Sequence, residues 1–169
     1  MGESFKKEKK VLVESNKSSV LLNCKNLTLE FNQKEFNSYL GKEVDFVQDN
    51  QSKSSRDTLR GLHFQKAPNA QGKLVRVIDG EIFDVVVDLR KESKTFGHSL
   101  SVILTSESFQ AFYVPEGFAH GFQVTSNTAT VFYKTTDFYN TETEVTLAWN
   151  DSETKINWPN SVNPNLSKK

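Results

Sequence analysis

The stretch KLVRVIDGEIFDVVVDL (residues 73–89) decides the fold class. It contains two short apolar runs, 73–78 and 81–89, and the pair Asp79-Gly80 lies between them. β-Branched residues favour strands, and an Asp-Gly pair between two apolar runs is a hairpin signal. We therefore predict two β-strands here, joined as a hairpin.

Similar short strands are predicted on both sides of this stretch. They cover residues 11–13, 20–22, 27–31, 44–50, 59–65, 99–104, 111–114, 119–124, 130–136 and 144–148. Residues 51–57 are predicted as a polar loop, and residues 115–117 as a turn. One helix is predicted over residues 33–40, because Asn32 can cap its start and Gly41 can end it. Many short strands without βα alternation indicate an all-β sandwich or barrel.

Composition narrows the class of protein further. The 169 residues fit one domain (1–169), with a polar arm at 1–19 and a tail at 160–169. Lys plus Arg and Asp plus Glu both number 21, so no nucleic-acid partner is expected. The single Cys24 excludes an intrachain disulfide, and no apolar run reaches the ~20 residues that span a membrane. The charged start does not resemble a secretory signal, so we expect a cytoplasmic protein.

The common cofactor motifs are missing from the sequence. It contains no P-loop, no GxGxxG after a strand, no HExxH and no CxxC. Its three histidines, His63, His98 and His120, stand apart from one another. Because a metal site in a small barrel needs clustered ligands, we predict neither a metal nor another cofactor.

A set of polar residues lies on strands that otherwise read as core. In Leu59–Gln65, period-two alternation places Gly61, His63 and Gln65 on one face. Arg60 joins that face only if Gly61 marks a β-bulge, as strand glycines often do.

Further polar residues extend this set along other strands. Gln48 and Asn50 share a face, Lys73 begins a strand, Tyr133 lies within one, and His120 follows the turn at 115–117. Taken singly, each is more often a satisfied structural group. Together inside a barrel they indicate a ligand cavity, because unpaired charges in an apolar interior are costly.

Several ordered motifs strongly resemble the dTDP-4-dehydrorhamnose 3,5-epimerase family, over about residues 32–159. These motifs are FVQDN (46–50), LRGLHFQ (59–65), QGKLVR (71–76), DVVVDLRK (84–91), PEGFAHGF (115–122) and YKTT (133–136). The resemblance implies a cupin jelly-roll barrel with one or two short helices, in a homodimer that exchanges N-terminal strands. It also implies an isomerase that epimerises a nucleoside-diphosphate 4-keto-6-deoxyhexose beside its ketone, in deoxysugar biosynthesis for a bacterial surface polysaccharide such as lipopolysaccharide O-antigen.

The resemblance also assigns roles to residues. His63 matches the family's base, Tyr133 its acid, and Lys73 the residue that stabilises the enolate. The remaining matches are sugar and diphosphate contacts at Arg60, Gln48 and Asn50, a base-stacking aromatic at Tyr139, and a supporting pair at His120 and Asp84. The chemistry of the first three agrees independently, because a proton beside a ketone needs a base near neutral pKa and a cation for the developing oxyanion.

Two stretches depart from the family pattern. The family places an Asp after Leu-Ser-x-Lys to orient its catalytic His, whereas this sequence reads Leu166-Ser167-Lys168-Lys169. We therefore expect His63 to lack that carboxylate. The family's nucleotide-reading Arg and Glu are replaced or shifted in residues 24–31, so CDP is considered beside dTDP.

The sequence leaves several functions open. We predict inversion at C3, and inversion at both C3 and C5 remains an alternative. A 3,4-ketoisomerase on the same barrel is a second reading, although such enzymes tend to carry two neighbouring histidines where this chain has His63-Phe64-Gln65. A catalytically inactive sugar-nucleotide-binding cupin is the third.

Overall fold

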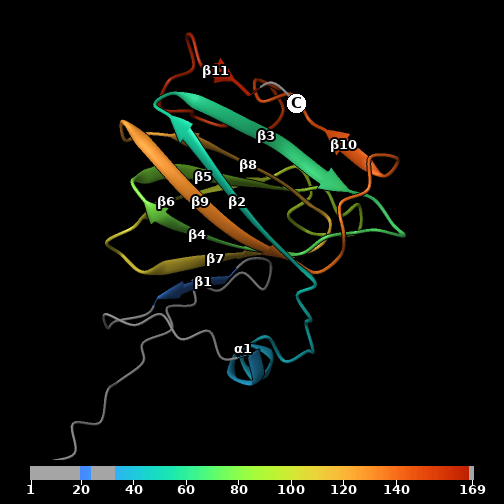
Figure 1. The fold of residues 1–169 in the computed structure, drawn as a ribbon. Helices are drawn as coiled ribbons and strands as arrows, with labels where there is room; N and C mark the ends of the chain where they lie inside the picture. Colours follow the sequence, from blue (N-terminus) through green and yellow to red (C-terminus); the bar gives the residue numbers. More distant parts are fainter. Residues whose placement is uncertain (1–19, 24–32, 168–169) are drawn as a thin grey trace, which may run out of the picture.

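The computed structural model describes residues 20–23 and 33–167. Almost all regular structure in them is β, and the helix is α1 (Gln33–Leu40) (Figure 1). The strands are β1 (Val20–Asn23), β2 (Gln48–Ser55), β3 (Thr58–Gln65), β4 (Lys73–Asp79), β5 (Glu81–Asp88), β6 (Ser99–Thr105), β7 (Gln110–Val114), β8 (Phe118–Val124), β9 (Thr128–Thr135), β10 (Glu144–Thr146) and β11 (Asn165–Leu166). The predicted all-β class and the helix over 33–40 are confirmed.

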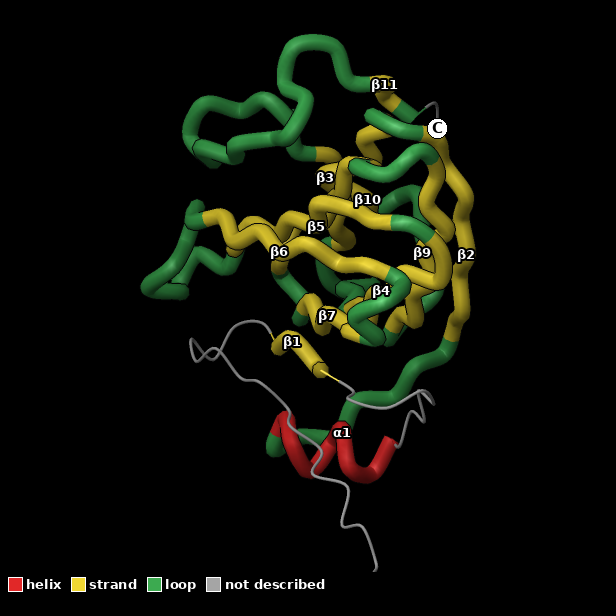
Figure 2. The backbone as a smooth tube through the Cα atoms, turned by 90° about the vertical axis from the view of Figure 1, so that its left-hand side faces the viewer, coloured by secondary structure: helices red, strands yellow, loops and turns green. Residues whose placement is uncertain are grey.

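The strands form two sheets that face each other (Figures 1 and 2). Sheet A has the order β1-β7-β4-β9-β2, and sheet B has the order β10-β3-β8-β5-β6. Neighbouring strands within both sheets are antiparallel, and β11 joins β3 in parallel. This is the jelly-roll barrel of the cupin fold that the sequence predicted.

The main core fills the space between the sheets. Both sheets contribute apolar side chains to it: Val75, Val77, Phe112, Val114, Ala129 and Val131 from sheet A, and Ile82, Val86, Leu104, Phe118, Phe122 and Val124 from sheet B. These side chains are at most 5% exposed, so the barrel is solid at this end. Burial of this kind stabilises a fold by roughly 25 cal/mol per Å² of apolar surface.

Each sheet is also covered on its outer face. Helix α1 lies beneath sheet A, where Phe36 packs edge-on against Tyr113 at 5.3 Å between ring centroids (Figure 2). Gly41, with φ of +66°, follows α1 directly, as the sequence predicted for the helix end. The C-terminal segment covers sheet B, and Trp158 packs there against Phe83.

The predicted boundaries of β2, an edge strand of sheet A, were wrong. A strand was expected at 44–50 and a polar loop at 51–57, but β2 begins at Gln48 and continues to Ser55. Every second residue of β2 faces inward and is polar, so apolar alternation fails as a signal there. Val44 and Phe46 instead pack against α1 ahead of the strand.

The predicted hairpin at Asp79-Gly80 is also wrong. The two strands that flank it exist, but β4 belongs to sheet A and β5 to sheet B. The Asp-Gly pair therefore carries the chain from one sheet to the other. The turn chemistry was correct, whereas the pairing of the strands is set by the barrel as a whole.

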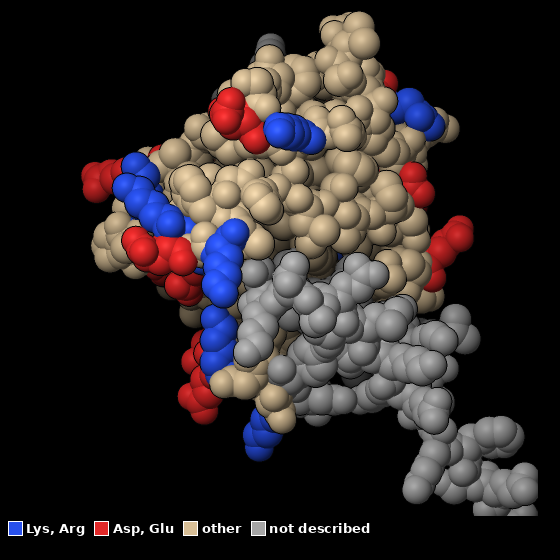
Figure 3. Space-filling view, turned by 180° about the vertical axis from the view of Figure 1, so that it is seen from behind, with Lys and Arg blue, Asp and Glu red and all other residues tan. Residues whose placement is uncertain are grey.

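Some expectations concern other parts of the chain. The strands predicted at 11–13 and 27–31 lie outside the described residues. Within the described part, no helix has the length and apolar character needed to cross a membrane. On the face shown in Figure 3, acidic and basic side chains of the described residues are interspersed.

Candidate active site

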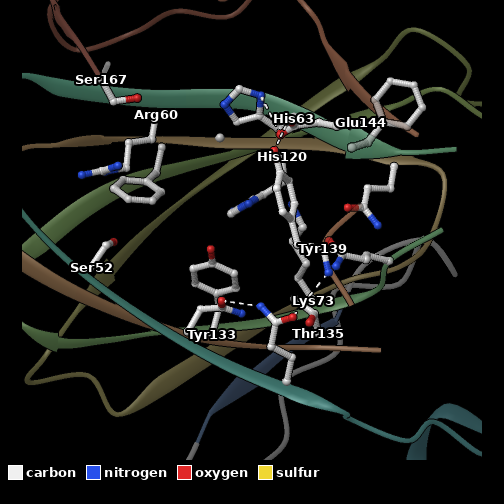
Figure 4. A pocket seen from close by; sticks show the side chains of 17 residues that line it. Ser52, Arg60, His63, Lys73, His120, Tyr133, Thr135, Tyr139, Glu144 and Ser167 are labelled. Carbon is white, nitrogen blue, oxygen red and sulfur yellow. Dashed lines mark hydrogen bonds and ion pairs between the residues drawn. The ribbon is translucent and has the colours of Figure 1, made fainter. Parts of the chain in front are cut away.

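A cavity of about 270 Å³ opens between the two sheets (Figure 4). It is lined by all eight residues that the sequence named as catalytic or substrate-binding: Gln48, Asn50, Arg60, His63, Lys73, His120, Tyr133 and Tyr139. The wall also holds Gln65, which the sequence places on the same face as His63, and residues that the sequence did not indicate as part of the site: Ser52, Phe64, Gln71, Gly121, Phe122, Thr135, Glu144 and Ser167.

A bulge in β3 brings Arg60 and His63 to the same face. The pairing of β3 with β8 shifts between these two residues, and Gly61 has a φ of +105°. Leu59 and Leu62 consequently both pack in the outer cluster of sheet B, although they too are three residues apart. The bulge that the sequence made a condition for Arg60 is therefore present.

Gly61 also allows β3 and β8 to approach closely. A Cβ at Gly61 would lie 2.6 Å from the His120 carbonyl oxygen, and a Cβ at Gly121 would lie 2.6 Å from the Arg60 carbonyl oxygen. Glycine is needed where backbones come this near. The close pair places His63 directly opposite His120 in the ladder.

Sheet A supplies the opposite wall through two rows of paired residues. Asn50 pairs with Tyr133, and Thr135 pairs with both Gln48 and Lys73. Because side chains on paired residues share a face, strand register alone directs this set into the barrel. Figure 4 shows His63 and Tyr133 on opposite sides of the cavity.

His120 is held by a buried carboxylate. Its Nε2 lies 2.9 and 3.0 Å from the two oxygens of Asp84, whose side chain is fully buried. A buried carboxylate needs such a donor, so Nε2 carries a proton that it donates to Asp84. Asp84 thus supports His120 from within the core, as the resemblance implied, and does not itself line the cavity.

Tyr133 keeps its proton in this environment. Burial raises the pKa of its hydroxyl above the ordinary 10.0, Arg60 opposes this rise, and the Glu144 carboxylate adds to it. The Arg60 Nε donates to Ser54 at 3.0 Å, which anchors the guanidinium on the cavity wall. A neutral phenol beside a fixed cation is suited to give a proton to a developing anion.

Asn50 lies in the cavity wall and has an unpaired amide donor. Its Oδ1 accepts a hydrogen bond from Gln48 Nε2 at 2.7 Å, which directs the amide nitrogen away from Gln48. That nitrogen, Nδ2, is buried and has no hydrogen-bond partner among the described residues. Buried donors are seldom left unpaired, so this nitrogen is an exception among the polar atoms of the wall.

The loop that carries Tyr139 is held by an amide network. Gln65 Nε2 donates to the carbonyl oxygens of Asn69 and Phe138, and Gln65 Oε1 accepts from the Asn140 backbone nitrogen. Tyr139 remains about half exposed at the cavity rim. Its hydroxyl donates to Glu144 Oε2 at 2.8 Å, and that bond is the main cause of its raised pKa.

His63 has two oxygen neighbours on strand β10. Its Nδ1 lies 3.2 Å from Thr146 Oγ1 and 3.8 Å from Glu144 Oε1. The sequence predicted His63 without the family's carboxylate, and Glu144 is a carboxylate near the ring that this prediction did not foresee. An acidic residue at the start of the predicted strand 144–148 was the available signal, but pairing of β10 with β3 could not be read from it.

The chemistry of the wall does not fit a metal site. No group of three or more His, Cys, Asp or Glu side chains within residues 20–23 and 33–167 could hold a metal ion. His63 and His120 have separate oxygen partners, Thr146 and Asp84 respectively. The wall instead combines two histidines, two tyrosines, a lysine and an arginine around one space.

Known proteins are similar to this chain in both sequence and fold. The family model described as dTDP-4-dehydrorhamnose 3,5-epimerase matches residues 26–169. The dTDP-4-dehydrorhamnose 3,5-epimerase of Salmonella typhimurium is 51% identical over 139 residues, which cover 82% of this chain and 76% of that protein.

Two solved structures have closely similar folds. The dTDP-4-dehydrorhamnose 3,5-epimerase of Elizabethkingia anophelis superposes with a TM-score of 0.88 at 41% identity, covering 94% of this chain and 91% of its own. The dTDP-6-deoxy-D-glucose-3,5-epimerase of Legionella pneumophila, in complex with dTDP-4-keto-L-rhamnose, gives 0.85 at 40% identity, with 93% and 86% covered. The match of fold, sequence and length establishes that this chain belongs to the dTDP-4-dehydrorhamnose 3,5-epimerase family of isomerases.

Proposed function

We propose that this chain epimerises a nucleoside-diphosphate-linked 4-keto-6-deoxyhexose, with His63 as the base and Tyr133 as the acid. The observation that carries the proposal is that the two residues project from opposing sheets into one cavity. Inversion of a carbon requires that a proton leaves one face and returns to the other. A base and an acid on opposite walls meet that requirement.

The reaction begins with removal of the proton on the carbon beside the ketone. His63 takes this proton, and the electron pair of the C–H bond moves to the ketone oxygen to form an enolate. Lys73 stabilises the negative oxygen from β4. A preorganised charge of this kind contributes several kcal/mol in a site that excludes water.

Tyr133 completes the inversion. Its pKa is raised by burial, so it enters the step protonated and gives its proton to the opposite face of the same carbon. The enolate collapses back to the ketone, and His63 and Tyr133 return to their starting states by exchange with solvent. Atoms and electrons balance in this scheme without an oxidant or reductant.

Other residues of the wall are suited to bind the sugar nucleotide. Asn50 and Arg60 both line the cavity, and Arg60 is a fixed cation that matches a diphosphate oxygen. The exposed Tyr139 ring at the rim offers a stacking surface for the base. We propose a dTDP sugar as the substrate because the relatives named above are dTDP-sugar enzymes.

CDP remains the competing nucleotide, since residues 24–31, which differ from the family pattern, lie outside the described residues. We propose that the enzyme inverts C3. Inversion of C5 as well is the alternative, because the relatives are named as 3,5-epimerases. A location in the cytoplasm also stays a prediction.

Deuterium exchange tests the proposal. The protein is incubated in deuterated water with dTDP- and CDP-4-keto-6-deoxyglucose in parallel, and loss of the C3 and C5 proton signals is followed by NMR. We expect exchange at C3, faster with dTDP, and none in His63→Asn. A failure to incorporate deuterium from either substrate contradicts the proposal, and nucleotide binding by calorimetry in that case identifies an inactive binding protein.

Product analysis in the same experiment separates epimerisation from ketoisomerisation. An epimerase leaves the ketone at C4, whereas a 3,4-ketoisomerase moves it to C3. A carbonyl carbon signal that shifts to C3 contradicts the epimerase assignment.

We also propose that the chain forms a homodimer. Strand β1 lies at the edge of sheet A, where its four residues pair with β7 (Figure 2). An edge strand that joins a sheet by backbone pairing can also be supplied by a second chain. This supports the exchange of N-terminal strands that the resemblance implied.

A further inference from the structure

Strand β10 gives His63 a neighbour on the side away from the cavity. The ladder between β10 and β3 places Thr146 directly opposite His63 and Glu144 opposite Gln65. Thr146 Oγ1 lies 3.2 Å from His63 Nδ1, within the range of a hydrogen bond. Because this contact follows from cross-strand pairing, it is set by backbone register and not by a long flexible side chain.

Thr146 does not belong to the cavity wall itself. Its side chain is exposed, and it is absent from the residues that line the cavity. Any effect of Thr146 on chemistry must therefore pass through His63. Its exposure also means that a substitution there leaves the core of the barrel intact.

The Glu144 carboxylate has a different part in this cluster. At 3.8 Å its Oε1 is too far from His63 Nδ1 for a hydrogen bond, and its Oε2 already accepts from the Tyr139 hydroxyl at 2.8 Å. The hydroxyl of Thr146 is thus the nearer of the two acceptors on β10. Glu144 adds negative charge on the Nδ1 side of the ring, which favours a proton on that nitrogen over Nε2.

The surroundings of Nδ1 bear on which nitrogen carries the proton of the neutral ring. A hydroxyl can donate or accept, and the Glu144 carboxylate 3.8 Å from the same nitrogen favours the arrangement in which Nδ1 carries the proton and Thr146 accepts it. If Nδ1–H donates to Thr146 Oγ1, the lone pair is left on Nε2. A ring that is locked in this tautomer and orientation needs no rearrangement before it accepts a proton.

We propose that Thr146 is a positioning residue for His63, which accepts Nδ1–H and so keeps Nε2 unprotonated as the base. The proposal rests on the function assigned to His63 above. In this arrangement a hydroxyl on the neighbouring strand holds the ring of the base in its orientation.

Two substitutions at Thr146 separate the hydroxyl from the side-chain volume. Thr146→Val keeps the shape and removes the acceptor, while Thr146→Ser keeps the acceptor and removes a methyl group. We expect the kcat for C3 exchange to fall roughly 3- to 10-fold in the valine variant, which matches the loss of one hydrogen bond. The serine variant is expected to restore the wild-type kcat, and KM is expected to stay the same in both.

The tautomer of His63 can be measured without substrate. The chain has three histidines, so the ¹⁵N signals of their rings can be assigned with His63→Asn as a reference. At alkaline pH we expect His63 to carry its proton on Nδ1 in wild type and in Thr146→Ser. In Thr146→Val the ¹⁵N shifts are expected to move towards a mixture of both tautomers.

A matched control distinguishes this effect from a general effect of valine on a strand. Thr128 is also an exposed strand threonine, at the start of β9 and outside the cavity. Thr128→Val is expected to keep the wild-type kcat and the wild-type His63 shifts.

Several results would overturn the proposal. A valine variant with wild-type kcat and unchanged ¹⁵N shifts contradicts it, and so does a serine variant as impaired as the valine one. If the wild type itself exchanges no proton, the proposed function fails. The ¹⁵N shifts still decide the role of Thr146 in that case, because they are recorded without substrate.

Discussion

Tyr133 illustrates how single residues acquire their state in this site. Burial raises the pKa of its hydroxyl, the Arg60 cation lowers it, and the Glu144 anion raises it again. The net shift is upward from 10.0, so the phenol is neutral over the whole physiological range. In that state Tyr133 can donate a proton and cannot accept one, which suits the acid role proposed for it, with His63 as the proposed base.

Loss of either group should abolish most of the activity. We expect Tyr133→Phe and His63→Asn to lower the epimerisation rate by at least ~10²-fold, in line with general acid–base contributions. The rate of deuterium entry and of product formation measures this. Tyr113→Phe, at a buried tyrosine of β7 outside the cavity, is the control and should keep the wild-type rate.

The raised pKa of Tyr133 also predicts how the epimerisation rate depends on pH. Because the pKa of Tyr133 is raised above 10.0, the group stays almost fully protonated up to about pH 9, and its loss of the proton should not reduce the rate there. An alkaline decline near pH 8 that disappears in Tyr133→Phe would contradict the assignment.

At the scale of the element, the bulge in β3 matters most. It turns Arg60 and His63 to the cavity and Leu59 and Leu62 to the outer cluster within one strand. A regular strand would place members of each pair on opposite faces. Both the core of sheet B and the site therefore depend on Gly61.

A Cβ at Gly61 should strongly destabilise the fold. Gly61→Ala adds an atom 2.6 Å from the His120 carbonyl oxygen and forces a side chain onto a φ of +105°. We expect a loss of about 2–4 kcal/mol in the free energy of unfolding, from strain and overpacking together. Gly97→Ala is the control, because φ is +78° there but no atom lies within 4 Å, and it should cost only about 1 kcal/mol. Equal losses in both variants, measured by denaturant titration, would show that close approach is unimportant.

The segment after β5 is fixed by Asp88. Burial alone would raise its pKa, but hydrogen bonds from Arg90, Ser93 and Thr95 lower the pKa well below the usual 3.8. Arg90 in turn lies over the Phe118 ring at 4.5 Å. This cluster ties the loop to the start of β8, the strand that carries His120.

The lowered pKa of Asp88 predicts acid sensitivity. A group with a lower pKa in the folded state stabilises the fold fully above its unfolded pKa, about 3.9, and progressively less as the pH falls below it. We expect Asp88→Asn to lose about 2–3 kcal/mol at neutral pH and to show a shallower further loss on acidification than the wild type. Urea titrations at neutral pH and at about pH 3 compare the two slopes. Parallel slopes would refute the role of Asp88.

At the scale of the whole molecule, the site exists only because two sheets face each other. Sheet B holds the proposed base His63, and sheet A holds Tyr133 and Lys73. The distance between these walls is set by the apolar core that fills the rest of the barrel. The edge of sheet A that β1 forms is the place where the proposed dimer would exchange strands.

Dimer formation can be tested directly. We expect a mass of twice 19.2 kDa by light scattering over a wide range of concentrations. Exchange of strands buries backbone groups in both chains, so dissociation should be slow. A mass of 19.2 kDa at micromolar concentration would contradict the proposed dimer.

The sequence predicted the local features of this protein well. Helix α1, the positions of most strands and the bulge at Gly61 follow from short-range patterns of apolar residues and glycines. It also named eight of the residues around the cavity, because polar side chains are conspicuous on apolar strands and match the family motifs.

Where the sequence failed, the missing information was long-range. The predicted strand at 44–50 ended before β2 does, because the inward side chains of β2 are polar residues of the cavity wall. Asp79-Gly80 was predicted as a hairpin turn, although the strands on its two sides belong to different sheets. Glu144 and Thr146 come near His63 only through the pairing of β10 with β3, across some 80 residues of chain.

The sequence by itself thus determined which strands form and which residue types are available for chemistry, since both depend on neighbours within a few positions. Only the tertiary structure decided which strands pair, which walls face each other and what lies beside His63. Those choices depend on how the whole barrel buries its apolar surface, and no local pattern encodes that balance.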